Sequence, residues 1–218
     1  MIRLVFDKRK SPLKILCIGS HCDDIEIGCG GTLLKLIEDF NGNVIVRWLV
    51  FSANPKREKE AARSAQSFLK RAKQKTISIE HFEDSFFPYS SASEIKKYLH
   101  RLSQEFDPDL IFTHHGRDLH QDHRLISELT WNAFRDHCIL EYEIPKYDGD
   151  LGSPNVFVPL KKSISQNKVS HLIRYFESQS HRNWFTKETF TSLHRLRGIE
   201  CNSSSGYAEA FYCRKIVL

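Results

Sequence analysis

Two clusters of histidine and aspartate, each directly after a short apolar run, constrain this chain more than any other feature. Residues 20–31 read SHCDDIEIGCGG after the apolar run 15–18, and residues 120–123 read HQDH after the apolar run 110–112. Such runs are typical of buried strands, and α/β proteins bind ligands at the carboxyl ends of their strands. Two histidines and one carboxylate with an open fourth position make a catalytic zinc site. We therefore expect the two clusters to meet at one metal ion.

Strand-like and helix-like segments alternate along the first two-thirds of the chain. The expected strands are 14–20, 44–51, 76–82 and 110–113, and the expected helices are 30–40, 55–71, 93–106 and one after His123. This alternation implies right-handed crossovers and an α/β fold with a mostly parallel β-sheet flanked by helices. The last third is less regular, with an expected strand at 139–144, a loop at 148–154, helices at 169–176 and 187–196, and a closing strand at 211–217. No linker divides the chain, so we expect a single domain, 1–218, with its core at about 14–217.

The bulk composition excludes several classes of protein. With 218 residues, 40% hydrophobic and 27% charged, the chain is typical of a soluble globular protein. The net charge of +5 suits an anionic substrate or a membrane surface, but a solvated exterior is the favoured interpretation. No Lys/Arg block with interleaved aromatic residues indicates nucleic-acid binding. No apolar stretch reaches the roughly 20 residues of an integral membrane segment, and residues 1–14 contain no secretory signal, so we expect a cytoplasmic protein with reduced cysteines.

The adjacent carboxylates Asp23 and Asp24 suit two different roles, because neighbours in a loop do not readily point the same way. One can bind the metal, while the other takes a proton from water, whose pKa a bound zinc lowers towards about 7. His120, if Asp122 or another acid keeps it protonated, can stabilise the oxyanion of a tetrahedral intermediate. The non-catalytic alternative is that the carboxylates cap the following helix. The presence of two such clusters, each after a strand, favours the metal site.

The glycines and the remaining histidines favour structural interpretations. Residues 28–31, GCGG, do not match a dinucleotide-binding fingerprint and are interpreted as a close-packed turn that opens a helix. His114 and His115 are expected to shape the rim of a pocket, and a role as further ligands stays open. His194 is interpreted as a surface or packing residue, with contact to the site left open.

Together the motifs resemble those of the zinc-dependent de-N-acetylases of the PIG-L, or LmbE-like, family. The similarity rests on H-x-D-D at 21–24 with GCGGT at 28–32, and on H-x-D-H at 120–123. Further similar segments are R-x-x-E-A at 57–61, PDLIFT at 108–113, YE at 142–143, NVF at 155–157, SQ at 178–179, RG at 197–198 and YAEAF at 207–211. The resemblance covers most of the chain. It implies a Rossmann-like fold and the removal of an acetyl group from an N-acetylated amino sugar.

Carried over by position, the resemblance implies a role for each matching residue. It implies zinc on His21, Asp24 and His123 and a general base at Asp23. It also implies that His120, oriented by Asp122, stabilises the oxyanion, and that Arg57, Tyr207 and Glu209 bind the substrate. Fe²⁺ or Mn²⁺ could replace Zn²⁺, since His and Asp ligands accept several divalent ions. The chain departs from the family's usual H-P-D-D-E at Cys22 and Ile25, which remove neither a ligand nor the base. Cys22 is either a tolerated substitution or a thiol that touches the metal or is redox-sensitive.

The expected function is zinc-dependent deacetylation of a small-molecule substrate of the N-acetylglucosaminyl type, with nucleotide- or lipid-linked glycan precursors among the candidates. Two alternatives stay open: a zinc amidohydrolase acting on a non-sugar amide, and a non-catalytic sugar-binding homologue. The sequence does not specify the sugar, the native metal or the oligomeric state, and a homo-oligomer remains open.

Overall fold

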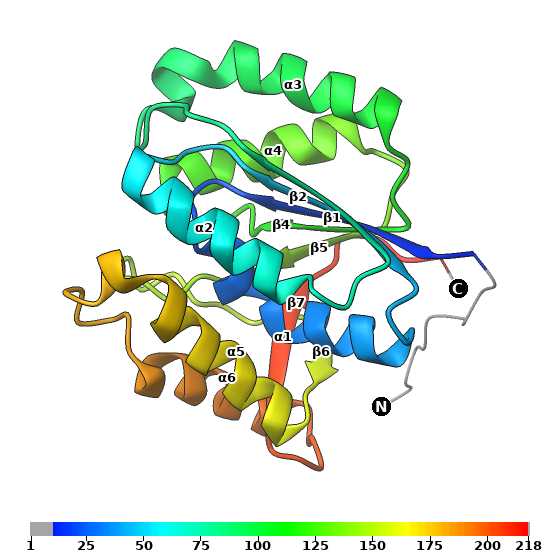
Figure 1. The fold of residues 1–218 in the computed structure, drawn as a ribbon, viewed down its shortest axis with the longest axis vertical. Coiled ribbons are helices and arrows are strands. Elements are labelled where there is room, and N and C mark those ends of the chain that lie inside the picture. The colour runs from blue at the N-terminus through cyan, green and yellow to red at the C-terminus, as the bar shows by residue number, and fades with distance from the viewer. Residues whose placement is uncertain (1–10, 218) are drawn as a thin grey trace.

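A computed structural model describes residues 11–217 as one seven-stranded sheet with helices on both faces (Figure 1). Five strands are parallel: β1 (Leu13–Gly19), β2 (Val44–Val50), β3 (Gln74–Ile79), β4 (Leu110–His114) and β5 (Ile139–Tyr142). An antiparallel edge of β6 (Val156–Pro159) and β7 (Ala208–Tyr212) completes the order β3-β2-β1-β4-β5-β7-β6. The expected α/β fold with a mostly parallel sheet is thereby confirmed.

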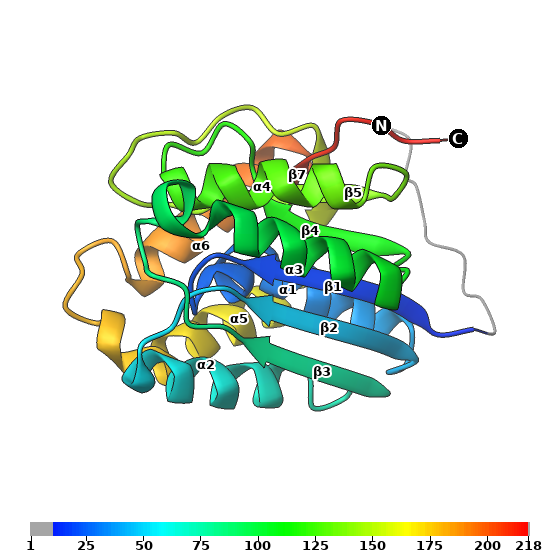
Figure 2. The ribbon, with the colours of Figure 1, turned by 90° about the horizontal axis from the view of Figure 1, so that it is seen from above.

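The helices form two layers (Figures 1 and 2). One layer contains α1 (Asp24–Asp39), α2 (Pro55–Phe68), α5 (Lys162–Tyr175) and α6 (Lys187–Glu200), and the other contains α3 (Ala92–Glu105) and α4 (Gln121–Ala133). Alternate residues of β1 serve the two layers, since Ile15 and Cys17 belong to one apolar cluster and Leu16 and Ile18 to the other. A strand buried on both sides has to be apolar at every position, which explains its unbroken apolar run. Within residues 11–217, no helix combines the length and the apolar character needed to cross a membrane.

The order in which the chain adds strands to the sheet reverses between β1 and β4. These two strands are neighbours, although two strands and three α-helices separate them in the chain. They pair in parallel, with Ile15 opposite Leu110 and Cys17 opposite Phe112. From β1 the chain continues towards β2 and β3, whereas from β4 it continues towards β5 on the other side. At such a switch point the connecting loops diverge and leave a crevice outside the carboxyl ends of the strands. Both histidine–aspartate clusters follow these two strands.

Several element boundaries differ from those expected. α1 begins at Asp24 rather than near Gly30, so its first two turns contain the glycine-rich segment. α5 begins at Lys162 rather than 169. The sequence did not indicate this start, because Ile164 is the one large apolar residue in the first turns and a single residue gives no helical periodicity. β6 was not expected. The closing strand is Ala208–Tyr212, not 211–217, since the backbone N–H of Cys213 donates to the side chain of Asn155 at 2.8 Å.

Side chains from the last third of the chain hold α1 against the sheet. The Tyr142 hydroxyl donates to the carbonyl of Ile18 at 2.6 Å, and the ring fills the space beside Gly28, where a Cβ atom would lie 2.1 Å from the ring carbon Cδ2. Glycine is therefore required at position 28 by close packing, not by an unusual backbone angle. Further along α1, the buried ion pair of Lys168 and Glu209 (2.5 Å) contacts the helix backbone. These contacts fix α1, whose first residue is Asp24.

Candidate active site

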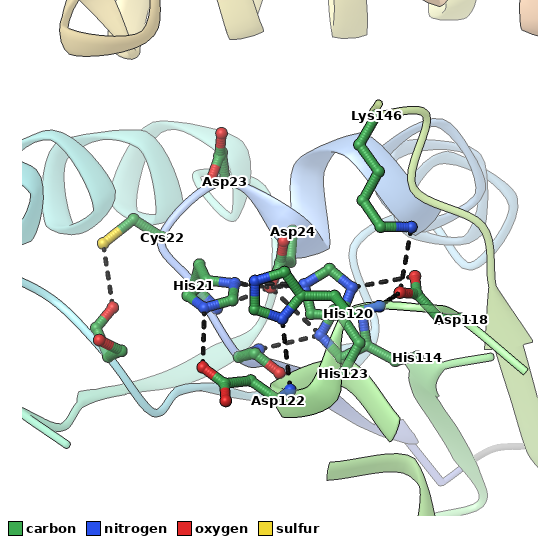
Figure 3. Close-up of polar contacts among 12 residues, drawn as sticks. His21, Cys22, Asp23, Asp24, His114, Asp118, His120, Asp122, His123 and Lys146 are labelled. Atoms are coloured by element: carbon green, nitrogen blue, oxygen red, sulfur yellow. Dashed lines mark hydrogen bonds and ion pairs between the residues drawn. The ribbon is translucent and has the colours of Figure 1, made fainter. Parts of the chain in front are cut away.

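His21, Asp24 and His123 come together in the crevice between β1 and β4 (Figure 3). His21 lies in the turn after β1, Asp24 is the first residue of α1, and His123 lies in the first turn of α4. The His21 Nδ1 atom lies 3.2 Å from His123 Nε2 and 3.4 Å from Asp24 Oδ2. The third side of the triangle, from His123 Nε2 to Asp24 Oδ2, is 3.7 Å. All three residues are at least 90% buried.

This triangle of donor atoms has the dimensions of a tetrahedral metal site. With metal–ligand bonds of about 2.0–2.2 Å, the ligand atoms of a tetrahedron lie about 3.3–3.6 Å apart. Two overlapping groups also bring their donor atoms within 4.8 Å of one another, His21 with His120 and His123, and Asp24 with His114 and His123. Two imidazoles and a carboxylate are a donor set for zinc and for other first-row divalent ions. The residues present therefore fit a divalent cation.

Each member of the triangle is held from behind by a polar partner. The far nitrogen of His21, Nε2, lies 3.3 Å from Asp122 Oδ2 and 3.1 Å from Asp84 Oδ1. The far nitrogen of His123, Nδ1, lies 2.9 Å from Asp118 Oδ2. Carboxylates in this position orient metal-binding imidazoles and raise their basicity.

Asp24 is held by groups that favour its ionised form. Its Oδ2 atom accepts the backbone N–H of His21 at 2.6 Å and lies 3.1 Å from His114 Nε2. Burial by itself raises the pKa of Asp24, but His123, His114 and His21 outweigh it and hold the pKa well below its usual range. Burial, with His114 adding to it, lowers the pKa of His123 to about 3. An anionic carboxylate beside a neutral imidazole is the protonation pattern that metal binding requires.

Asp23 points away from the imidazoles (Figure 3). It occupies the N-cap position of α1, but its side chain makes no capping hydrogen bond, so the helix-capping alternative does not account for it. Its Oδ1 atom accepts from Arg57 Nη2 at 2.5 Å. Burial raises the pKa of Asp23, with Arg57 opposing the shift. Arg57 also lines a cavity of about 230 Å³, together with Ser52, Ala53, Asn54, Phe82, Glu83 and Asp84.

The expected contact between Asp122 and His120 differs in the structure. The Asp122 carboxylate accepts from the backbone N–H groups of Ser85 (2.6 Å) and Phe87 (3.2 Å) and contacts His21, so it does not orient the His120 ring. The backbone N–H of Asp122 donates to His120 Nδ1 at 3.3 Å instead. The physical reason is that His120 is the N-cap of α4, which aims its ring at the first N–H groups of the helix.

The structure brings Arg57 to the site but not Tyr207 and Glu209. The Tyr207 ring packs under the Arg195 guanidinium, at 5.1 Å from Cζ to the ring centroid. The Glu209 oxygens accept from Lys168 Nζ and from the N–H groups of Gly31 and Thr32. Gly31 lies about two helical turns, or about 10 Å, beyond Asp24. All these contacts engage the Glu209 carboxylate inside the fold, which disfavours the expected role in lining the sugar pocket.

The two departures from the family motif are core residues. Cys22 is fully buried, its Sγ atom donates to the carbonyl of Ser52 at 3.4 Å, and burial raises the pKa of its thiol well above the usual range. A thiol in this state is inert as a nucleophile. In Figure 3 it points away from the imidazoles, so the structure favours a tolerated substitution. Ile25 is fully buried in the apolar core.

Sequence reasoning missed three residues of the site, Asp84, Asp118 and Lys146, and left the role of a fourth, His114, open. His114 was expected at a pocket rim but is fully buried, with its ring stacked on His123 at a centroid distance of 3.9 Å. A signal for Asp118 exists in the sequence. An acidic residue two positions before the cluster at 120–123 is well placed to accept a hydrogen bond from the second ring nitrogen of a metal-binding histidine. Asp84 and Lys146 lie in loops far from the motifs, and no pattern identifies them.

Known proteins similar to this chain include deacetylases and one hydratase. The model of the family described as PIG-L: GlcNAc-PI de-N-acetylase matches residues 16–134. The uncharacterized deacetylase YaiS of Escherichia coli (strain K12) is 28% identical over 179 residues, covering 78% of this chain and 92% of that protein. The solved N,N′-diacetylchitobiose deacetylase of Pyrococcus horikoshii has a TM-score of 0.69 at 22% identity, covering 95% of this chain and 87% of its own.

The hydratase is GalB of Pseudomonas putida KT2440, a 4-carboxy-2-hydroxymuconate hydratase. Its structure has a TM-score of 0.74 at 15% identity and covers 94% of this chain and 98% of its own. At these identities the structural likeness shows the fold alone, which hosts more than one chemistry.

Proposed function

The chain belongs to the PIG-L family of de-N-acetylases, and on this premise we propose that it is a zinc hydrolase that removes acetate from an N-acetylated amino sugar. One observation carries the proposal. The donor atoms of His21, Asp24 and His123 form a triangle of tetrahedral dimensions, next to a second buried carboxylate, Asp23. A metal site beside a carboxylate that does not itself bind the metal is an arrangement suited to the hydrolysis of an amide.

In this proposal His21 Nδ1, Asp24 Oδ2 and His123 Nε2 hold the ion. When bound, zinc would activate water and polarise the carbonyl group of the acetamide. Fe²⁺ and Mn²⁺ accept the same donors, so the choice of metal follows from supply as well as from geometry. The contacts of Asp122 and Asp118 to the far nitrogens of the two histidines support this assignment, because they leave the near nitrogens free to face the ion.

Asp23 is the proposed general base. Its carboxylate is buried, and its pKa is raised by that burial, which improves its ability to accept a proton near neutral pH. Arg57 keeps the carboxylate in place and opposes the shift. After taking a proton from the attacking water, Asp23 would return it to the nitrogen of the departing amine. Arg57 would at the same time contact substrate hydroxyls, since it lines the adjoining cavity.

His120 is the proposed hydrogen-bond donor to the acyl oxygen. Its Nδ1 atom accepts the backbone N–H of Asp122, so the neutral ring carries its proton on Nε2. Burial and the nearby His21 lower the pKa of His120, which favours this neutral form. A neutral Nε2–H can stabilise the charge that develops on the acyl oxygen in the transition state. The orientation comes from the backbone of Asp122 and not from its carboxylate.

The sugar class is supported by similar proteins that are named as deacetylases, including an N,N′-diacetylchitobiose deacetylase. A zinc amidohydrolase acting on a non-sugar amide is the second candidate, and the shared fold of GalB shows that the architecture accepts other substrates. A non-catalytic sugar-binding homologue is disfavoured by the complete set of ligands and base.

The test is acetate release by the zinc-loaded protein from N,N′-diacetylchitobiose and other N-acetylglucosaminides, with N-acetylated amino acids as the non-sugar arm. We expect Asp23→Asn to lower kcat by about 10²–10⁴-fold while retaining its zinc, because the variant keeps the ligands and loses the base. Asp39→Asn, at a half-buried ion pair at the other end of α1, is the matched control. Equal turnover by Asp23→Asn and wild type would refute the base, and turnover confined to the amino-acid arm would refute the sugar.

A further inference from the structure

A second cavity, of about 490 Å³, lies on the other side of the segment that follows β4. His115, Arg117, Glu141, Asn155, Tyr212 and Arg214 are among its lining residues. None of these belongs to the proposed metal centre. His114 and His115 are consecutive along an extended segment, so their side chains point to opposite faces. His114 contacts Asp24, whereas His115 stacks on Tyr212 at a centroid distance of 3.6 Å.

Glu141 organises the floor of this cavity. Its side chain is 2% exposed, and its two oxygens accept four hydrogen bonds. Oε1 accepts from Trp131 Nε1 (2.6 Å) and Arg214 Nε (2.7 Å). Oε2 contacts His115 Nδ1 at 2.8 Å and accepts from the backbone N–H of Gly116 at 2.9 Å. Because its hydrogen-bonding capacity is used, Glu141 serves as an anchor for cavity side chains and not as a ligand group.

The two arginines of the cavity present free donors. Arg214 uses only Nε to bind Glu141, and its guanidinium lies over the Trp131 ring at 4.4 Å, which leaves both Nη nitrogens without a hydrogen bond to another described residue. Arg117 is exposed and has no ion-pair or hydrogen-bond partner within residues 11–217. Two guanidinium groups against one carboxylate give the cavity a net positive charge. Arginine side chains whose guanidinium N–H groups are free to donate are typical of sites that bind phosphate or carboxylate.

We propose that this cavity binds a small phosphorylated metabolite, whose phosphate is held by Arg117 and Arg214. A phosphomonoester carries nearly two negative charges at neutral pH, whereas a carboxylate ligand carries one. Two guanidinium groups therefore match the charge of a phosphomonoester better than that of a carboxylate. The volume of about 490 Å³ suits a ligand of the size of a sugar phosphate. None of the lining residues belongs to the proposed metal centre, so the cavity would hold a second ligand and not the proposed substrate.

Isothermal titration of the zinc-loaded protein tests the proposal, with ribose 5-phosphate, inorganic phosphate, ribose and succinate as probes. We expect ribose 5-phosphate to bind, ribose not to bind, and succinate to bind at least tenfold more weakly. Arg117→Ala should weaken the binding of ribose 5-phosphate at least tenfold, since it removes one of the two charges. Arg101→Ala, at an exposed arginine of α3, removes the same charge elsewhere and should bind as wild type does.

Three results would overturn the assignment. Equal affinity of Arg117→Ala and wild type for ribose 5-phosphate would mean that phosphate binds elsewhere, the metal centre included. Tighter binding of succinate would change the ligand class to carboxylates. Binding of inorganic phosphate alone, unaffected by Arg117→Ala, would mean an adventitious ion only. Arg117 is exposed and has no hydrogen-bond or ion-pair partner within residues 11–217, so we expect its replacement to leave folding unchanged. Arg214→Lys, which keeps the charge and loses the fork, is the second variant.

Discussion

At the scale of single residues, Asp118 is the point where three segments meet. One oxygen contacts His123 Nδ1 at 2.9 Å, and the other lies 3.0 Å from Lys146 Nζ and accepts from the backbone N–H of His120 at 2.8 Å. Burial by itself raises the pKa of Asp118, but His123, with His114 and Lys146 adding to it, holds the pKa well below its usual range. An ionised carboxylate can only accept hydrogen bonds. His123 must then carry its proton on Nδ1, which leaves the Nε2 lone pair for a metal ion.

Replacement of Lys146 tests this chain of contacts. We expect Lys146→Met to weaken zinc binding by up to about tenfold, at the lower end of the about 10–100-fold that direct partners of a ligand contribute, because Lys146 acts through Asp118. Lys146→Arg should retain most of the affinity. The measurement is zinc competition with a chelator, with His123→Ala as the reference for loss of a ligand and Lys161→Met, at an exposed ion pair, as the control. Unchanged affinity in Lys146→Met would show that Asp118 orients His123 without help.

At the scale of elements, α1 is the helix on which the site depends, and its middle is bound by two buried charges. The Lys168 ammonium donates to the carbonyl of Ile27 at 2.6 Å, and Glu209 accepts from the N–H of Gly31 at 2.7 Å. In a regular α-helix, the N–H of Gly31 and the carbonyl of Ile27 are partners of each other. The ion pair thus contacts both halves of one helical hydrogen bond, which the glycines allow by leaving room for it.

Breaking this ion pair should destabilise the fold. We expect Lys168→Met to lower the free energy of unfolding by about 3–5 kcal/mol, because Glu209 would remain as an uncompensated buried charge. The double variant Lys168→Met/Glu209→Gln should recover part of the loss. Urea denaturation measures both, and Lys162→Met, exposed on the same helix, is the control. A loss no larger than that of the control would mean that water or relaxation compensates the charge.

These elements also show how far the sequence could predict the structure. Unbroken apolar runs identified β1 and β4, because strands buried on both faces admit few other residues. The start of α1 was missed, since glycines disfavour a helix locally and only the distant Tyr142 ring makes them necessary. For the site, the position of each motif after a strand predicted that the two clusters meet, and the resemblance to the family implied His21, Asp24 and His123 as the ligands. Neither could show that Asp122 contacts His21, because that depends on where the loop at 84–87 passes.

At the scale of the whole molecule, His194 links stability to pH. It is 2% exposed between α5, α6 and β7, where its ring nitrogens contact Ser165 Oγ (2.8 Å) and Lys168 Nζ (3.1 Å) and Glu209 lies 4.0 Å away. Burial, and then the charge of Lys168, lower the pKa of His194 to about 2. A histidine whose pKa is lowered by folding stabilises the fold above its unfolded pKa of about 6.5. This contribution is lost as the pH falls from about 6.5 towards 2.

The pH dependence of unfolding checks this behaviour. We expect the free energy of unfolding to fall by up to about 1.4 kcal/mol per pH unit below pH 6 through this one group. His194→Gln, which keeps a donor and an acceptor, should show a smaller loss between pH 7 and pH 5. His181→Gln, at an exposed histidine, is the control and should follow wild type. The same acid-induced loss in His194→Gln and wild type would assign it to other groups.

The contacts between α1 and side chains from the last third of the chain have a consequence for how such chains diverge and recombine. The matched family segment ends at residue 134, and every proposed metal ligand lies within it. Tyr142, Lys168 and Glu209 lie outside it, yet they pack against the helix that begins with Asp24. A chimera that joined residues 16–134 to an unrelated last third would keep all the proposed ligands but lose the groups that seat this helix. The two parts therefore have to change together, and the metal motifs cannot be transplanted as an independent module.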